Sequence, residues 1–344
     1  MRLIWRAVPP PDVPDPKGGV MEYVMLGRTG LRVSVAGLGC GGFSRLGLGT
    51  GNSHAEAVAL VRQALDMGVN LFDTAAAYGT EGVVGEAIKH VPREDVVIAT
   101  KAWIPRGGGR HAAERAVASL EASLRRLGTD YVDIFQLHGV MPEAYEQACE
   151  VIAPALLKER EKGKLRHLGV TEAASEDPEH DMLQRAVEDE VWDVVMVAFH
   201  MMHQNARAKI FPRTIANRVG TLLMFAVRNI FSRPERLASA LRELTRRREL
   251  PRWLADAPNP LGFLLHEAGA SNITEAAYRF ARHEPGVDVV LFGTGDPDHL
   301  RANIAALLAP PLPLADRLTL TKLFGRLSGV GLDPPYNMPG IGSP

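Results

Sequence analysis

Residues 69–79 read VNLFDTAAAYG, an apolar run that only Asn70 interrupts, ending at Asp73 and followed by Tyr78 and a glycine. The apolar run predicts a short buried strand, and the glycine predicts a turn after it. An acid at the end of a buried strand, with a tyrosine on the next loop, is typical of catalytic apparatus. The pattern also fits a packed strand with an incidental aspartate and a surface tyrosine, so the rest of the chain must decide.

Strand-like apolar segments alternate with helix-like segments throughout the chain. Counting residues 34–38 as the first strand and 69–72 as the second, eight such segments occur, and nearly all precede a helical pattern. Capping residues mark where helices begin: Ser53 and Glu56 fit a capping box, and Asp296 fits an N-cap. The other six strands are predicted at 96–100, 131–137, 164–170, 192–199, 220–225 and 288–293.

These strands are apolar nearly throughout, which is typical of parallel sheets that are buried on both faces. Eight strand–helix units predict an α/β fold, a (β/α)8 TIM barrel, with a doubly wound sheet as the alternative. A hairpin pattern over 21–35 leads into the first strand. We divide the chain into a Pro-rich leader (1–20), a barrel (21–310) and a C-terminal segment (311–344) expected near the active-site mouth.

The composition excludes several classes of function. The 344 residues contain 39 Lys plus Arg and 40 Asp plus Glu, a net charge of −1, which leaves no electrostatic footprint for nucleic acid or an anionic membrane. Cys40 and Cys149 lie far apart and lack metal-ligand spacing, so we expect a reducing compartment and no metal site. No apolar run is long enough to span a membrane. We therefore expect a cytoplasmic protein with a small-molecule partner, and the oligomeric state stays open.

The polar residues at the ends of successive strands form a constellation. In a TIM barrel the chemistry gathers at the C-terminal ends of the strands. The second strand ends at Asp73, with Tyr78 just beyond it, the third strand ends at Lys101, and the fourth ends at His138. Taken singly, Lys101 also fits a solvated strand-end lysine and His138 a hydrogen-bonded core histidine. Together they predict an acid, a phenol, an ammonium and an imidazole at one barrel mouth.

Six segments carry a resemblance to a known family. They are LGRTGLRVSVAGLGCGG (26–42), GVNLFDTAAAYG (68–79), VVIATK (96–101), LRRLGTDYVDIFQLH (124–138), KGKLRHLGV (162–170) and GTGDPDHLRANIAAL (293–307). Over about 21–310 the chain resembles the aldo-keto reductases. The resemblance implies that the hairpin closes the bottom of the barrel.

The resemblance also implies an activity, the NAD(P)H-dependent reduction of an aldehyde or ketone to an alcohol, or the reverse. Tyr78 would be the general acid, and Lys101 would favour its phenolate. Asp73 would hold Lys101 in place and charged, and His138 would orient and polarise the carbonyl. The cofactor would supply the hydride.

The implied cofactor contacts depart from the family pattern after the fifth strand. Thr171 and Glu172 stand where many members have Ser-Asn, Met196 replaces a glutamine, and Met224 stands where a ring often stacks on nicotinamide. Ordinary strand packing is the alternative for these positions. The implied cofactor-binding residues are Gly41, Gly42, Phe43, Thr171, Met196, Met224, Arg228, Gly293, Thr294, Gly295, His299 and Asn303.

The 2′-phosphate contacts bear on the choice of cofactor. The family's lysine is replaced by Gly293, although residues 293–295 could offer backbone N–H groups to a phosphate. Asp296 opposes a phosphate there, and Arg301 could compensate. On the resemblance we expect NADP(H) in preference to NAD(H).

The substrate pocket is expected to be lined by Trp103, Phe199 and His200, with Tyr336 of the tail as a further wall. Gly139 stands where many members have Trp or Arg, so one wall is missing or is supplied from elsewhere. An aromatic lining suits an aldehyde, a hydrophobic ketone or a sugar.

Two other functions remain open from the sequence. A cofactor-binding regulatory or sensor barrel with little turnover could keep all four catalytic-type residues. A metal-dependent hydrolytic barrel would need a His-x-His pair after the first strand, where residues 39–41 read Gly-Cys-Gly.

Overall fold

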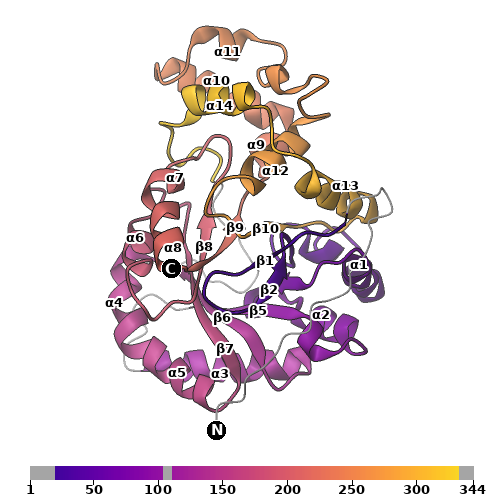
Figure 1. Cartoon of the computed structure of the whole chain (residues 1–344), viewed down its shortest axis with the longest axis vertical. Coiled ribbons are helices and arrows are strands. Elements are labelled where there is room, and N and C mark those ends of the chain that lie inside the picture. The colour runs from indigo at the N-terminus through magenta and orange to yellow at the C-terminus, as the bar shows by residue number, and fades with distance from the viewer. Residues whose placement is uncertain (1–19, 104–110, 333–344) are drawn as a thin grey trace.

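Eight parallel strands close into a barrel, in the order β10–β3–β4–β5–β6–β7–β8–β9 (Figure 1). The computed structural model describes residues 20–103 and 111–332; the leader, apart from Val20, and Tyr336 lie outside the described residues. The closed barrel confirms the predicted fold and excludes the doubly wound sheet. The barrel strands are β3 (Ala36–Gly39), β4 (Leu71–Asp73), β5 (Val97–Trp103), β6 (Val132–Val140), β7 (Leu165–Glu172), β8 (Val194–Ala198), β9 (Gly220–Met224) and β10 (Val289–Phe292).

The helices surround the barrel, and the predicted caps begin them. The Ser53 side chain and the Glu56 carboxylate form the predicted capping box of α1. Asn272 Oδ1 accepts from the Glu275 N–H at 2.9 Å at the start of α12. The helices are α1 (His54–Asp66), α2 (Glu81–Ile88), α3 (Ala112–Leu127), α4 (Tyr145–Gln147), α5 (Ala153–Glu161), α6 (Asp181–Ala186), α7 (Ala206–Lys209), α8 (Phe211–Asn217), α9 (Asn229–Ser232), α10 (Pro234–Arg246), α11 (Arg252–Asp256), α12 (Ile273–Arg282), α13 (Pro297–Leu308) and α14 (Leu314–Phe324).

The predicted helix over 143–162 is interrupted. A 3₁₀ turn, the short α4 and a π-turn over Ala148–Ile152 precede α5. Pro154 explains the break, because it has no N–H to donate to the preceding turn and its ring crowds the carbonyl there.

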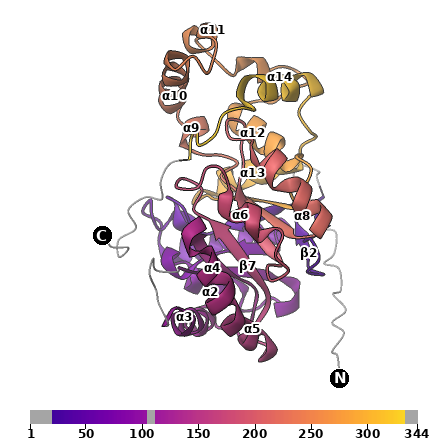
Figure 2. The same cartoon turned by 90° about the vertical axis from the view of Figure 1, so that its left-hand side faces the viewer.

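The hairpin of β1 (Tyr23–Met25) and β2 (Arg32–Ser34) lies across one end of the barrel (Figures 1 and 2). Its apolar side chains belong to an inner cluster with the residues that begin the barrel strands. That cluster comprises Leu26, Leu31, Val33, Leu71, Val97, Ala99, Ile134, Val194, Met196, Leu222 and Val289. The hairpin therefore closes the end where the strands begin, as the resemblance implied, and leaves the opposite end for chemistry.

Side chains alternate between the inside and the outside of the barrel along each strand. In β5, Val97 and Ala99 join the inner cluster, whereas Ile98 and Ala102 pack outward with the helices. This period of two decides which polar residues face the barrel axis.

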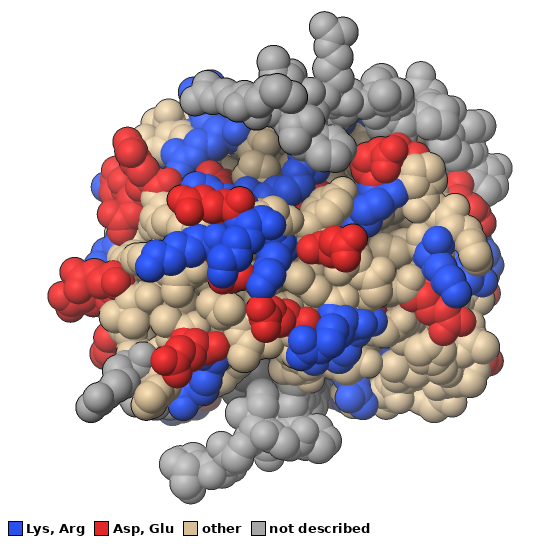
Figure 3. Space-filling model, turned by 90° about the horizontal axis from the view of Figure 1, so that it is seen from below, with Lys and Arg blue, Asp and Glu red and all other residues tan. Residues whose placement is uncertain are grey.

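The long connection after β9 forms a lobe with α14 at one end of the molecule, uppermost in Figures 1 and 2. In α10 the buried residues Leu237, Leu241 and Leu244 lie on one face, at the spacing of an amphipathic helix. The face of the molecule seen in Figure 3 carries basic and acidic residues side by side, without a large patch of one sign. In the ranges that the structure describes, no helix is both long and apolar enough to cross a bilayer.

Candidate active site

Three neighbouring strands bring the predicted constellation together at the C-terminal end of the barrel. Asp73 ends β4, Lys101 lies in β5 two positions beyond the inward-facing Ala99, and His138 lies in β6. Tyr78 lies on a 3₁₀ turn, Ala76–Tyr78, that follows β4. The period of two along β5 explains why the Lys101 side chain enters the barrel.

Lys101 is the centre of this group. Its ammonium donates to Asp73 Oδ2 at 2.7 Å, to the Thr74 carbonyl at 3.0 Å and to the Tyr78 hydroxyl at 3.5 Å. These three bonds account for the three donors of a lysine. The Tyr78 hydroxyl lies 3.4 Å from His138 Nε2, so one phenol oxygen contacts both the ammonium and the imidazole.

The Lys101–Asp73 pair is fully enclosed, with the lysine at 0% exposure and the aspartate at 4%. Burial by itself lowers the pKa of Lys101, but the Asp73 carboxylate and the Tyr78 oxygen more than offset this effect and raise that pKa above its usual value. The lysine is therefore a fixed cation beneath the phenol.

Tyr78 and His138 are both held uncharged. Burial raises the pKa of Tyr78, and the nearby Lys101 ammonium opposes this effect without overcoming it. The sequence argument considered only the ammonium, so it missed this direction. Burial and the same ammonium lower the pKa of His138 to about 3, which makes it a neutral imidazole. Both groups can donate a hydrogen bond.

Gln136 is a further member of the group that the sequence analysis missed. It is fully buried in β6, and its Nε2 donates to Asp73 Oδ1 at 3.3 Å, so both oxygens of Asp73 are held. Its Oε1 is buried and has no hydrogen-bond partner within the described ranges. The available signal was its position two residues before His138, on the same inward face of the strand.

Replacing Gln136 with Met should lower kcat/KM about tenfold, because one hydrogen bond to a buried carboxylate is lost at similar side-chain volume. The pH dependence of kcat should shift as well, since Asp73 loses a donor to its charged form. Gln136→Glu, which cannot donate when ionised, should be at least as damaging. A melting temperature lowered with unchanged kcat and pH profile would reduce Gln136 to a packing role.

Two glycines shape the space beside Tyr78 and His138. A Cβ at Gly41 would lie 2.4 Å from a Tyr78 ring carbon, so only glycine leaves the ring its place. Gly139 has φ +64°, and a Cβ there would lie 2.9 Å from the Trp103 ring. Trp103, 41% exposed, meets the His138 ring edge to face at 5.7 Å. Trp103 therefore occupies the wall that the sequence leaves open at Gly139.

The predicted residues of the later strands, Thr171, Met196 and Met224, face the barrel interior at different depths. Thr171 is buried, and its oxygen accepts from the Gly139 N–H at 2.7 Å, which leaves the hydroxyl proton for another acceptor. Met196 packs within the inner cluster, and Met224 lies partly buried between that cluster and Leu332 of the C-terminal segment. Packing thus accounts for both methionines, with Met224 nearer the mouth.

Glu172 points away from the barrel, because it follows the inward-facing Thr171. Its carboxylate accepts from the Ala198 N–H at 2.7 Å and pairs with His180 Nδ1, also at 2.7 Å. His180 Nε2 faces Asn205 Oδ1 at 2.9 Å, so both ring nitrogens meet an acceptor. Burial lowers the pKa of His180, but Glu172 and Asn205 outweigh it and raise that pKa. Glu172 connects β7 to β8 and does not contact the group of Asp73, Tyr78, Lys101 and His138, which we call the tetrad.

Phe199 and His200 are not brought to the tetrad, which argues against them as substrate walls. Phe199 is fully buried outside the barrel and stacks on Phe280 with ring centroids 5.5 Å apart. His200 is fully buried and accepts from the Met202 N–H at 3.2 Å. The alternation of side chains along β8 explains the position of Phe199: Ala198 faces the mouth, so the next side chain faces the helices.

The remaining predicted residues lie on loops that follow β3, β9 and β10 and, for His299 and Asn303, in α13. Gly42 and Phe43 follow β3, where Phe43 is 58% exposed and a Cβ at Gly42 would meet nothing within 4 Å. Arg228, after β9, lies over the Phe225 ring at 4.1 Å. Beyond β10, Gly293 and His299 are exposed, Gly295 is partly exposed, and Thr294 and Asn303 are buried.

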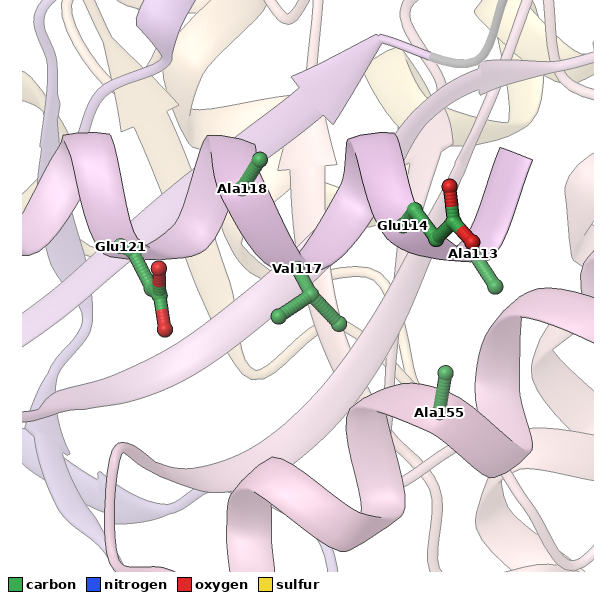
Figure 4. A pocket seen from close by; sticks show the side chains of 6 residues that line it. All are labelled: Ala113, Glu114, Val117, Ala118, Glu121 and Ala155. Carbon is green, nitrogen blue, oxygen red and sulfur yellow. The ribbon is translucent and has the colours of Figure 1, made fainter. Parts of the chain in front are cut away.

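An open groove between α3 and α5 lies on the outside of the barrel (Figure 4). Its lining is mostly alanine and valine, and one of its two glutamates, Glu121, pairs with Lys164 at 2.6 Å. The groove contains no group suited to carbonyl chemistry. Within the described ranges, no cluster of three or more His, Cys, Asp or Glu side chains is arranged to hold a metal ion.

The chain is similar to known proteins along most of its length. Residues 37–321 match the model of the Aldo/keto reductase family. The chain is 30% identical to Aldo-keto reductase YhdN from Bacillus subtilis over 299 residues, covering 82% of this chain and 87% of that protein. It is 40% identical to L-galactose dehydrogenase from Arabidopsis thaliana over 157 residues, covering 44% of this chain and 48% of the plant protein, about half its length.

A solved structure is similar across nearly the same span. The aldo/keto reductase from Klebsiella pneumoniae, in complex with NADP and acetate, superposes with a TM-score of 0.62 at 22% identity. The match covers 89% of this chain and 96% of that one and concerns the fold. On the family match and the B. subtilis relative, the chain belongs to the aldo/keto reductase family.

Proposed function

We propose that Tyr78, Lys101, Asp73 and His138 form the catalytic group of an NAD(P)H-dependent reductase that converts an aldehyde or ketone to an alcohol, or the reverse. The observation that carries this proposal is one phenol oxygen, 3.5 Å from a buried ammonium and 3.4 Å from a neutral imidazole. A weak acid placed between a cation and a hydrogen-bonding ring suits proton donation to a carbonyl oxygen.

The residues around Tyr78 fit a nicotinamide ring. Gly41 lets the Tyr78 ring lie against the backbone that follows β3, and the Thr171 hydroxyl keeps a proton for an acceptor such as a carboxamide oxygen. A nicotinamide bound there supplies the hydride. The protein's part is placement, exclusion of water and proton transfer.

Each residue of the group has a distinct task in the proposal. His138 donates a hydrogen bond to the substrate oxygen and polarises the carbonyl. Tyr78 gives its proton to that oxygen as negative charge develops on it. Lys101 stabilises the phenolate that remains, and Asp73 keeps Lys101 charged and in place. Gln136 positions Asp73 from below.

The exposed indole of Trp103 beside His138 makes the substrate wall aromatic, which suits an aldehyde, an apolar ketone or a stacked sugar. The C-terminal segment contributes Leu332, which packs on Ala174, Ala198 and the partly buried Met224. This contact supports the proposal that the segment lies near the mouth.

The sequence resemblance and the NADP in the K. pneumoniae structure support NADP(H) as a cofactor candidate. A cytoplasmic location stays a prediction that rests on the cysteine usage.

The test is a panel of aldehydes and ketones offered with NADH and with NADPH, followed by the loss of reduced-cofactor absorbance. We expect turnover of at least one carbonyl class. Cofactor binding without hydride transfer to any carbonyl, even in a single turnover, would contradict the proposal and favour a sensor barrel.

Arg228 is proposed to bind the cofactor pyrophosphate from the loop after β9. Its guanidinium lies over the Phe225 ring, which holds it at the rim of the barrel. Arg228→Ala should weaken cofactor binding about tenfold, the effect of losing one charge-assisted bond to phosphate, with little change in melting temperature. Arg236→Ala, on the exposed side of α10, is the matched control and should leave the Kd unchanged. Equal Kd values for all three proteins would remove Arg228 from the site.

A further inference from the structure

We infer that the loop 293–298, between β10 and α13, selects NAD(H) against NADP(H). The inference rests on the proposed function, because it assumes that the adenosine half of the cofactor lies against this loop. β10 pairs with β3, whose extension carries Gly41 against the Tyr78 ring. The loop after β10 therefore lies on the same rim of the barrel as the nicotinamide position.

The loop is held in one conformation by its neighbours. Asn52 Nδ2 donates to the Gly295 carbonyl at 2.8 Å, and a Cβ at Gly295 would lie 2.4 Å from Gly47 Cα. Thr294 Oγ1 accepts from the Asp296 N–H at 3.0 Å and donates to the Asp296 carbonyl at 3.2 Å. The Thr294 hydroxyl is thus engaged within the loop and is not available to a phosphate.

The N-terminus of α13 already contains an anion. Asp296 Oδ1 accepts from the Asp298 N–H at 2.8 Å and from the His299 N–H at 2.9 Å. These bonds hold the pKa of Asp296 below its usual value, so the carboxylate is charged. The backbone donors that attract a phosphate at other helix N-termini are occupied here by a side chain of the same sign as the phosphate.

The local charges leave no surplus of cations. Arg301 is paired with Asp298, one turn along the same helix. Over 293–303 the two carboxylates and one guanidinium leave a charge of −1, with His299 counted as neutral. The loop 41–52, which packs against this one, adds only Arg45, so the two loops together sum to zero. A 2′-phosphate brings a charge of about −1.5 to −2 near neutral pH, and nothing here balances it.

A ribose diol meets the opposite situation. Its hydroxyls are donors, and a carboxylate is a pure acceptor. The Asp298 side chain is 85% exposed at the start of α13, and a carboxylate that accepts from the ribose 2′-hydroxyl is the usual device for binding NAD. The carboxylates of the loop therefore attract the ribose 2′-hydroxyl of NAD(H) and repel the 2′-phosphate of NADP(H), and both effects favour NAD(H).

The test is the Kd of NADH and of NADPH for the full chain, measured by fluorescence quenching without any substrate. We expect NADH to bind about tenfold more tightly than NADPH, or better. The gap should narrow as ionic strength rises, because salt screens the repulsion. NADPH binding as tightly as NADH overturns this inference and leaves the proposed function standing, whereas binding of neither overturns both.

Two charge-removing variants sharpen the test. Asp296→Asn keeps a good N-cap, and Asp298→Asn releases Arg301 from its partner. Each should tighten NADPH binding several-fold without tightening NADH binding. Asp130→Asn, which removes an exposed charge just before β6 at the opposite end of the barrel, should change neither Kd. The assignment to this loop is overturned if all three variants change the Kd of NADPH equally, or if neither Asp296→Asn nor Asp298→Asn changes it.

Discussion

Tyr78→Phe should lower kcat/KM for carbonyl reduction by about 10²–10⁴-fold, the usual contribution of a positioned general acid. The variant removes only the oxygen that lies between Lys101 and His138. The ring can remain packed against Gly41, so the protein around the proposed nicotinamide position should keep its shape. The Kd of the reduced cofactor should therefore stay within about twofold of the wild-type value.

Tyr131→Phe is the matched control for this prediction. Tyr131 immediately precedes β6, near the closed end of the barrel, where its ring lies under Arg93 at 4.0 Å. The control should keep both turnover and cofactor affinity. Unchanged turnover in Tyr78→Phe would remove the general-acid assignment, and lost cofactor binding would show that the hydroxyl supports the site rather than the chemistry.

Lys101→Met should reduce kcat by about 10²–10³-fold, because the phenolate formed at Tyr78 loses its stabilising cation. The same change should lower the free energy of unfolding by about 3–5 kcal/mol, since it leaves the buried Asp73 carboxyl without its charged partner. The loss should depend on pH. Burial already raises the pKa of Asp73, and the Lys101 ammonium opposes this effect, so without the ammonium that pKa rises further above its unfolded value. The penalty relative to the wild type is therefore smallest in acid, where the carboxyl is protonated in both proteins, and grows as the pH rises.

The double variant Lys101→Met/Asp73→Asn separates the two effects. Removing the unpaired carboxylate should restore much of the stability and should abolish most of the pH dependence that Lys101→Met introduces. Activity should stay low. Urea unfolding at several pH values measures the first effect, and single-turnover hydride transfer measures the second. Lys162→Met is the control, because the Lys162 side chain is exposed and Glu159 keeps Lys164 as a second partner, so the change should cost less than about 1 kcal/mol. A pH-independent loss in Lys101→Met would contradict an ionic role for the pair.

Residues whose position follows from local rules were predictable from the sequence. Asp73, Lys101 and His138 could be placed at strand ends because apolar runs mark strands and parallel strands end on one rim. The period of two would also have predicted Gln136 beside His138. The same rule, counted along β8, would have excluded Phe199 from the barrel mouth. The predicted strand ended at residue 199, whereas β8 ends at Ala198, and this difference of one residue led to the wrong prediction. Strand boundaries are set by the neighbouring strands, so the sequence alone does not define them sharply.

The sequence by itself determined the eight strand–helix units, the hairpin pattern and which four residues stand at strand ends, because strand, turn and cap signals are local. That the hairpin closes the barrel was implied by the family resemblance, and the closure of eight parallel strands brings the four residues to one rim. Only the tertiary structure decided what each buried or loop charge is paired with. Glu172 pairs with His180, and the Trp103 ring packs beside Gly139. In the β10–α13 loop, Asp296 accepts from the backbone N–H groups at the start of α13, and Asp298 pairs with Arg301. The physical reason is that a charge interacts through space with whatever the fold brings within a few ångströms of it, and a linear sequence does not contain those distances.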